Sequence, residues 1–257
     1  ADWRFPTSCE SRCTWRATGI SDWRDFNWSP FPHPVGAGRV TVDGNVVRHC
    51  AHRINPESAV IEIDGVRVGR VARVYLALNK PRGLLTTRND PQGRPTIYEC
   101  LDDKTLPFVG PVGRLDQASE GLLLLTNDSQ WSAQLLDPAS HVDKTYHVQV
   151  RGRADASIVE RVAAGVVEQR SGEPLSVKRV SLLRVGSRSS AWLEVVLDEG
   201  KNRHIRRLLA ELGIDVLRLV RVAIGPLALG ALAKGKWRLL TPGEVQALRG
   251  PSPQSPP

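Results

Sequence analysis

Asp116 is a single charged residue whose surroundings could support chemistry. It ends the motif Gly113-Arg114-Leu115-Asp116 and precedes a polar turn that leads to Gly121. A carboxylate close to an arginine stays ionised and can act as a nucleophile or a base. Aspartate also stabilises turns and helix starts. The local spacing by itself favours this structural role over the chemical one.

A second candidate is the basic segment at residues 199–209. Residues 201–221 contain six basic and two acidic residues, which is half of the net charge of the chain. Four apolar residues recur at the spacing of one helical face, and the arginines fall on another side. The apolar residues are Ile205, Leu208, Leu209 and Leu212. Such a concentration of cations suits a phosphate-binding surface. An ordinary solvated helix face remains the alternative, and the flanking strand patterns argue against a membrane-surface helix.

Motifs for other reaction classes do not assemble in this sequence. The four cysteines are Cys9, Cys13, Cys50 and Cys100, and they form no Cys-x-x-Cys pair. A zinc site is therefore not expected, and neither is a zinc deaminase. The phosphate-loop motif and the Gly-x-Ser-x-Gly nucleophile motif are both missing.

Composition favours a folded protein with a polyanionic partner. The 257 residues are 41% hydrophobic and contain 35 Lys and Arg against 27 Asp and Glu, a net charge of +8. A positive excess of this size suits RNA or another polyanion, because binding releases condensed counterions. The sequence has no apolar stretch of the length of a membrane span or secretory signal, so we expect a cytoplasmic protein without a membrane partner.

The hydrophobic patterns predict an α+β fold. Two Asp-Gly turns, at 43–44 and 64–65, predict hairpins in a small β unit at 38–70. Beyond it, a domain at 71–250 mixes both patterns, and few strand pairs have the long crossover of a parallel sheet. We expect strands at 74–78, 122–126, 145–150, 175–184, 190–197 and 215–224, and helices at 129–136, 155–164, 202–212 and 242–248.

The two ends of the chain do not follow these patterns. Residues 1–37 hold four of the seven tryptophans and show neither helical nor strand periodicity. The chain contains no methionine and begins with Ala1. Our hypothesis is that this irregular segment derives from a misplaced start or a reading-frame error. The tail at 251–257 is expected to be disordered.

Five ordered blocks resemble the ribosomal small-subunit pseudouridine synthase A family, which includes large-subunit enzymes of the same type. Together they run across some 170 residues from about Tyr75 to Leu248. The blocks are Leu78-Asn79-Lys80-Pro81-Arg82-Gly83, residues 112–128 around Asp116, Lys144-Thr145-Tyr146, residues 199–207, and residues 219–230. The order of the blocks is far more specific than any one of them.

The resemblance implies an activity and a set of roles. Asp116 would be the nucleophile that enables glycosidic bond cleavage, Tyr146 would stack on the target base, and Arg206 would pair with Asp116 and keep it ionised. The uracil would leave through N1 and rejoin the ribose through C5, with no metal or organic cofactor. The first covalent step stays open between attack on the sugar, attack on the ring and a glycal route. Arg114 would contact the backbone or fill the gap left by the base. The full set of expected RNA-binding residues is Lys80, Arg114, Lys144, Lys201, Arg203, Arg207 and Arg221.

The sequence departs from the family pattern at a few positions. Residue 204 is His where the family usually has Gln, and residue 208 is Leu where Met is common. The unit at 38–70 resembles the second half of an S4 RNA-binding domain, and residues 1–37 occupy the place of the missing first half. The resemblance implies a long, mainly antiparallel sheet preceded by this partial S4-like unit.

We therefore expect a monomeric pseudouridine synthase that acts on ribosomal RNA or a ribosomal subunit precursor. The main alternative is a non-catalytic, ribosome-associated RNA-binding protein with the same fold, and retention of Asp116 argues against it. A third reading, a membrane-surface or protein-interaction module built on 201–221, predicts no RNA affinity. The sequence does not name the uridine or choose between small- and large-subunit RNA.

Overall fold

The computed structural model describes most of the chain beyond residue 33. The described residues are 34–49, 52–54, 58–69, 71–101, 103, 105–152, 155–185, 190–198, 201 and 203–249. They form two units. The smaller comprises the described residues up to Val74 together with Thr105–Gly110 and Asn127–Gln130, and the larger contains the rest. The predictions for residues 1–33 and for the tail at 251–257 lie outside the described residues.

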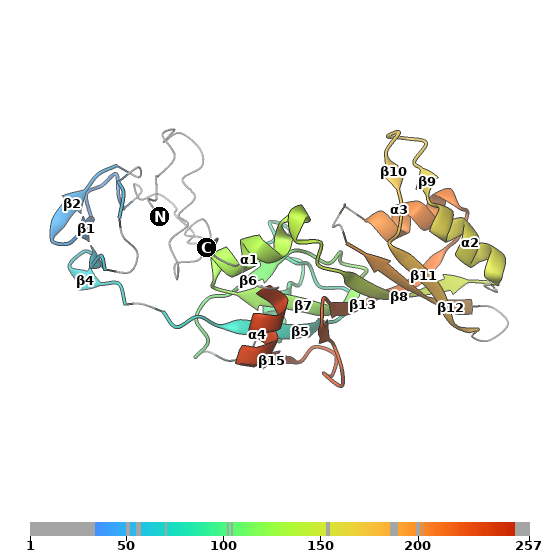
Figure 1. Cartoon of the computed structure of the whole chain (residues 1–257). Coiled ribbons are helices and arrows are strands. Elements are labelled where there is room, and N and C mark those ends of the chain that lie inside the picture. Colours follow the sequence, from blue (N-terminus) through green and yellow to red (C-terminus); the bar gives the residue numbers. More distant parts are fainter. Residues whose placement is uncertain are drawn as a thin grey trace, which may run out of the picture. The chain divides into compact units, whose positions relative to one another are not determined.

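The smaller unit contains a four-stranded antiparallel sheet in the order β2-β1-β3-β4 (Figure 1). Its strands are β1 (Val40–Val42), β2 (Asn45–Val47), β3 (Ile61–Ile63) and β4 (Val66–Arg67). Both Asp-Gly turns have positive φ at each residue, from 49° to 80°. Aspartate tolerates this conformation and glycine adopts it freely, so both predicted hairpins are confirmed. Four valines form the core of the sheet: Val35, Val40, Val42 and Val47.

The larger unit is built on a nine-stranded sheet in the order β11-β12-β8-β13-β7-β5-β15, with β6 on β7 and β14 on β13. The strand bounds are β5 (Tyr75–Lys80), β6 (Gly110–Val112), β7 (Glu120–Thr126), β8 (Lys144–Arg151), β11 (Arg179–Val185), β12 (Ser190–Leu197), β13 (Val216–Ile224), β14 (Leu227–Ala228) and β15 (Trp237–Leu239). β13 and β7 pair in parallel, whereas the other neighbours in this order pair antiparallel. The α+β prediction with a mainly antiparallel sheet is confirmed.

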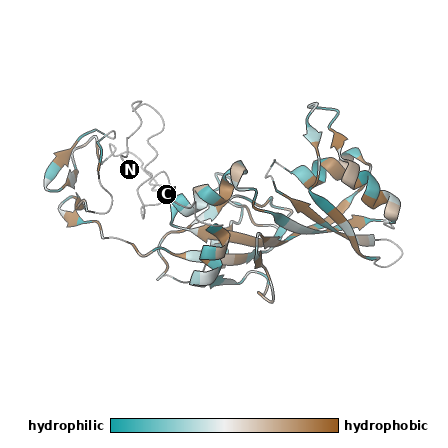
Figure 2. Ribbon diagram, viewed as in Figure 1, coloured by the Kyte–Doolittle hydropathy of each residue, from teal (hydrophilic) through white to brown (hydrophobic). Residues whose placement is uncertain are grey.

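Helices cover parts of this sheet. They are α1 (Ser129–Leu136), α2 (Ala156–Ala164), α3 (His204–Glu211) and α4 (Pro242–Arg249), with short 3-10 turns η2 (Ile97–Cys100) and η3 (Pro138–Ser140). α2 and α3 pack on one face of β8 and β12 (Figure 1). The buried core there joins Leu208 and Leu209 to Val148, Leu193 and Val195. Figure 2 shows hydrophobic and hydrophilic residues mixed along these helices, as expected of amphipathic helices.

One predicted strand is wrong in its extent. Residues 175–184 were expected as a single strand, but the structure has a short strand β10 (Pro174–Leu175) and then β11, which starts at Arg179. The strand is interrupted because its two parts pair with different strands. β10 pairs with β9 (Val166–Val167), whereas Arg179 pairs with Val196 on β12. Leu175 is buried in the core, so the chain turns between the two pairings.

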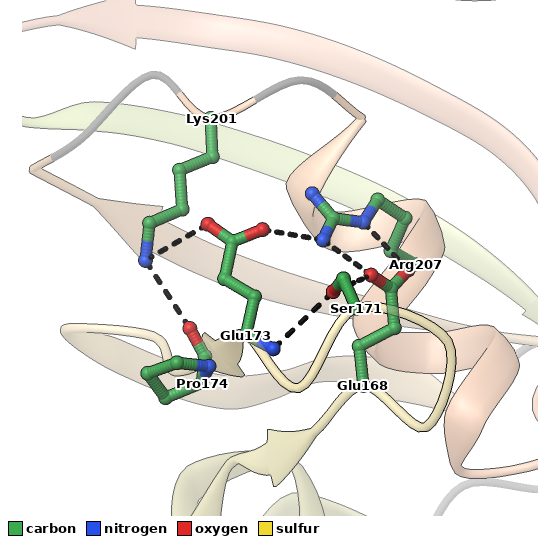
Figure 3. Close-up of polar contacts among 6 residues, drawn as sticks. All are labelled: Glu168, Ser171, Glu173, Pro174, Lys201 and Arg207. Carbon is green, nitrogen blue, oxygen red and sulfur yellow. Dashed lines mark hydrogen bonds and ion pairs between the residues drawn. The ribbon is translucent and has the colours of Figure 1, made fainter.

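The β9–β10 hairpin is fastened to α3 by one arginine. The Arg207 guanidinium donates to both carboxylate oxygens of Glu168, at 2.7 and 2.6 Å, and to Glu173 at 2.5 Å (Figure 3). Ser171 also donates to Glu168. These bonds, with Arg207 as the main cause, hold the pKa of Glu168 at about 2. We call this group of residues the hairpin clasp.

Gly121 permits the close approach of β7 and β13. Its φ is +103°, and a Cβ added there would lie 2.2 Å from the Arg221 carbonyl oxygen and 2.8 Å from the Arg221 nitrogen. Both neighbours are backbone atoms, which cannot rotate away as a flexible side chain could. The parallel pairing of Arg221 with Gly121 therefore depends on the absence of a side chain at residue 121.

We predict that Gly121→Ala lowers the free energy of unfolding by at least about 2 kcal/mol, from backbone strain combined with overpacking. Denaturant unfolding measures this change. Gly83→Ala is the matched control, because Gly83 has a φ of +102° and open space around its Cβ position. It carries the strain without the clash, so equal losses in the two variants would contradict the close-approach argument.

The hairpin clasp predicts an acid-sensitive stability. The pKa of Glu168 in the folded protein is about 2, below its ordinary value of 4.5, so its contribution is complete above pH 4.5 and is lost as the pH falls toward 2. The stability difference between wild type and Glu168→Gln should shrink across that window in denaturant unfolding at stepped pH. Glu160→Gln, an exposed glutamate of α2, serves as control. A difference that stays constant from pH 6 to pH 3 would refute the role of the clasp.

Candidate active site

The loop between β6 and β7 presents Asp116. Gly113 has a φ of +74°, and the Ser119 N–H donates to the Asp116 carbonyl at 2.9 Å, which closes a tight turn. Leu115 is buried and anchors the loop, whereas Asp116 is half-buried. Among the described residues, the Asp116 carboxylate makes no hydrogen bond or ion pair that would occupy it.

Lys80 holds this loop in place from below. Its ammonium group donates to the carbonyl oxygens of Ser119 at 2.9 Å, Asp116 at 3.1 Å and Pro81 at 3.2 Å. The side chain is fully buried, and burial lowers the pKa of Lys80 to about 8, although Asp116 and Glu120 act in the opposite direction. Lys80 was expected to contact RNA. That assignment is corrected, because its three donors are all used by backbone carbonyls inside the fold.

The segment that follows β5 supplies further anchors for the loop. The Thr86 hydroxyl donates to the Leu115 carbonyl at 2.6 Å. The Gly83 N–H donates to the Gln117 carbonyl at 2.8 Å, and the Gln117 amide returns a bond to the Gly83 carbonyl at 3.1 Å. The first family motif therefore positions the second, and Asp116 is held by backbone contacts on two sides.

Asp116 borders a cleft of about 600 Å³, which we call the first hollow. The β6–β7 loop, β8 and the start of α3 surround it, and Tyr146 lies in its wall. Five cations and three acids line it: Arg114, Lys144, Lys201, Arg203, Arg221, Asp116, Asp137 and Asp198. The cleft is within the size range of small-molecule sites and has room for a nucleoside.

Arg206 lies on the other side of Asp116. It lines a second hollow of about 640 Å³, which also contains Asp116, Arg114 and Arg203. Its guanidinium donates to the Ala118 carbonyl at 3.0 Å. Burial lowers the pKa of Arg206, whereas the nearby Asp116 raises it. Within the described part of the chain, the expected partnership with Asp116 takes the form of a bond to its loop and an electrostatic attraction, without a direct ion pair.

The other expected RNA-binding residues differ in how accessible they are. Arg114 and Arg203 are exposed and border both hollows. Lys144 is half-buried in the first hollow and donates to the Asp198 carbonyl at 3.3 Å. Burial, followed by the charge of Arg221, lowers the pKa of Lys144. Arg114 and Arg203 are therefore the cations best placed to meet a phosphate group.

Of the expected RNA contacts, Arg207 is part of the hairpin clasp and Lys201 lies beside it. Arg207 is bound by Glu168 and Glu173, and these bonds raise the pKa of Arg207. Its charge is compensated within the protein by these two carboxylates, and its role in RNA binding stays a prediction (Figure 3). Lys201 lies 3.6 Å from Glu173 and donates to the Pro174 carbonyl at 3.2 Å, yet it still borders the first hollow. The clasp thus fixes one side of the cleft.

Sequence reasoning missed some residues of the site. His204 is 3% exposed and lines the first hollow at the start of α3. Thr86 carried no motif of its own, and only the fold brings it to Leu115. A signal did exist for Lys80, because it shares a strand face with the buried residues Leu76 and Leu78 at a spacing of two.

No helix among the described residues is both long and apolar enough to cross a bilayer. No group of three or more His, Cys, Asp or Glu side chains in the described part is arranged to hold a metal ion.

Comparisons with known proteins show the family of this chain. Residues 74–211 match the model of the family described as RNA pseudouridylate synthase. An uncharacterized RNA pseudouridine synthase of Aquifex aeolicus is 39% identical over 214 residues, covering 82% of this chain and 84% of the relative. A ribosomal large subunit pseudouridine synthase B of Bacillus subtilis is 34% identical over 217 residues, covering 84% of this chain and 87% of the relative.

A solved structure shows the same fold. The crystal structure of a pseudouridylate synthase aligns with a TM-score of 0.62 at 28% identity, covering 84% of this chain and 90% of that one. The family match at residues 74–211 includes the Asp116 loop and β8. The chain therefore belongs to the RNA pseudouridine synthases, enzymes that isomerise uridine within RNA.

Proposed function

We propose that this protein converts a uridine of ribosomal RNA to pseudouridine, with Asp116 as the nucleophile. The observation that carries the proposal is the placement of Asp116, whose loop is held by Lys80 and Arg206 while its carboxylate borders the first hollow. The names of the Bacillus and Salmonella relatives support ribosomal RNA, and specifically the large subunit. The cations around Asp116 support a polyanionic substrate.

The reaction needs few protein groups. The C1′–N1 bond breaks, the uracil rotates in the cleft, and a C1′–C5 bond forms. The proton on C5 is then lost and N1 gains a proton, so the product is an isomer of the substrate. Asp116 enables the cleavage as a nucleophile, and Tyr146 stacks on the base from the wall of the first hollow. Arg206 supports Asp116 from the second hollow through the Ala118 carbonyl. We propose that the protein acts as a monomer.

The cleft also bears on the form of the RNA. A base stacked in a duplex cannot reach a side chain inside a hollow, so the target uridine must leave its stack. Loops and bulges offer such bases at the lowest cost. Arg114 and Arg203, exposed at both hollows, are placed to bind the flanking phosphates. We propose that the small four-stranded unit takes part in choosing the RNA, as its resemblance to a partial S4 domain implies.

We predict that wild-type protein releases tritium from ribosomal RNA labelled at uridine C5 and that Asp116→Asn releases none. The amide keeps the shape of the side chain but is a far weaker nucleophile, so the loss should exceed about 10³-fold. RNA affinity should remain within about twofold, because the phosphate contacts lie elsewhere.

Two outcomes of that assay would count against the proposal. Equal release by both proteins would refute the role of Asp116. RNA binding without release by either protein would favour the alternative, a non-catalytic RNA-binding protein. An RNA from the small subunit, assayed beside one from the large subunit, tests the choice of substrate that the relatives suggest.

We predict that Arg203→Ala weakens RNA binding at every sequence tested and lowers the slope of log Kd against log salt by about one. The reason is that an exposed cation at the cleft binds phosphate without reading bases. Lys236→Ala is the matched control, since it removes the same charge from an exposed residue outside both hollows. Equal changes in the two variants, measured by titration from 50 to 300 mM salt, would show that total charge and not the cleft governs binding.

A further inference from the structure

We propose that Arg221 binds a carbonyl oxygen of the target uracil and stabilises the negative charge that the ring gains when the glycosidic bond breaks. This inference rests on the proposed function and assigns a role within the same cleft. It makes Arg221 a catalytic residue that touches the base, in addition to Asp116 and Tyr146.

Arg221 has a fixed place in the floor of the first hollow. It lies on β13 between β7 and β8, paired with Gly121 on one side and Tyr146 on the other. Its side chain is 6% exposed, and Nε donates to the Leu122 carbonyl at 2.7 Å. One bond therefore orients the guanidinium plane, and the residue lines the same cleft as Asp116 and Tyr146.

The other end of this guanidinium lacks a partner. Nη2 of Arg221 is buried and makes no hydrogen bond among the described residues. Leaving a buried donor unsatisfied destabilises the folded protein, and more so when the group is charged. A native fold that carries this cost at the floor of a cleft is prepared to donate to a ligand. Arg221 is one of the residues that line the first hollow, so this unused donor belongs to a side chain of the cleft that would hold the base.

The charge of Arg221 is also uncompensated within the described structure. Arg218, three residues earlier on the same strand, forms an ion pair with Glu120 at 3.0 Å. Among the described residues Arg221 has no such carboxylate partner, and burial, followed by the charge of Arg221, lowers the pKa of Lys144. A ligand that develops negative charge in this site is therefore favoured.

The location favours a base over a phosphate as the ligand. Arg114 and Arg203 are exposed at the cleft, where a solvated phosphate can reach them. Arg221 is buried beside Tyr146, the residue placed to stack on the base, so the edge of a stacked uracil comes closest to it. The chemistry agrees, because the electron pair of the broken C1′–N1 bond stays on the ring and is shared by N1, O2 and O4. The C5 proton leaves after the new bond forms.

The test combines a side-chain change with an atom change in the substrate. RNAs carry tritium at C5 of the target, which is uridine, 2-thiouridine or 4-thiouridine, and single-turnover release is measured. Arg221→Met should lower the release rate by about 10²-fold, comparable to loss of one oxyanion donor, with RNA Kd within twofold. Sulfur in place of the oxygen that Arg221 binds, O2 or O4, should lower the release rate of the wild-type protein. The same sulfur should not lower the release rate of Arg221→Met any further.

The controls separate this role from a structural one. Arg218→Met removes an arginine from the same strand and should retain the sulfur effect. Arg221→Lys keeps a cation and a donor for Leu122, and it carries the same test if Arg221→Met does not fold. A sulfur effect that persists in either Arg221 variant would overturn the proposal. A loss of RNA affinity with an unchanged sulfur effect would show phosphate binding instead, which also overturns it. If wild type releases no tritium, the proposed function itself has failed.

Discussion

The arrangement around Asp116 depends on one buried cation. The Lys80 ammonium binds the carbonyls of Pro81, Asp116 and Ser119, so the end of β5 and the β6–β7 loop share a single charged group. Displacing the loop would leave that charge buried without its acceptors, and losing a partner of a buried charge costs about 3–5 kcal/mol. The backbone of Asp116 is therefore fixed by electrostatics inside the fold, independently of any substrate.

The sheet extends this constraint to the rest of the cleft. β7 begins directly after the loop, and the missing side chain at Gly121 lets β13 approach its backbone. β13 in turn carries Arg221 opposite Tyr146 on β8. Three adjacent strands thus relate the position of the loop to that of Tyr146 and Arg221 in the lining of the first hollow. The hairpin clasp fixes α3 through Arg207. Its Glu173 also forms an ion pair with Lys201, which borders the first hollow.

Local signals in the sequence predicted most of the elements. The Asp-Gly turns gave both hairpins, and periodicity gave α1 at 129–136 and β12 at 190–197 with the bounds that the structure has. The candidate site came from ordered family blocks. The sequence did not predict contacts between residues that are distant along the chain. Glu168 lies 39 residues from Arg207, and Asp116 lies 36 residues from Lys80. A basic residue looks the same in sequence whether a carboxylate, a carbonyl or a phosphate is its partner, so the sequence does not show that Lys80 and Arg207 bind groups within the fold.

These distant partners divide the basic residues of the cleft by task. Lys80 and Arg206 bind the Asp116 loop through carbonyl oxygens, and neither occupies the carboxylate. Asp116 is thereby positioned by cations and still available to a substrate. Arg207 is neutralised by the clasp, whereas Arg114 and Arg203 remain exposed at both hollows. Arg221 fits none of these tasks, because it is buried, oriented by one bond and left with an unused donor. A charged donor kept in that state is costly to the folded protein alone, and its cost is offset only when a ligand completes the site.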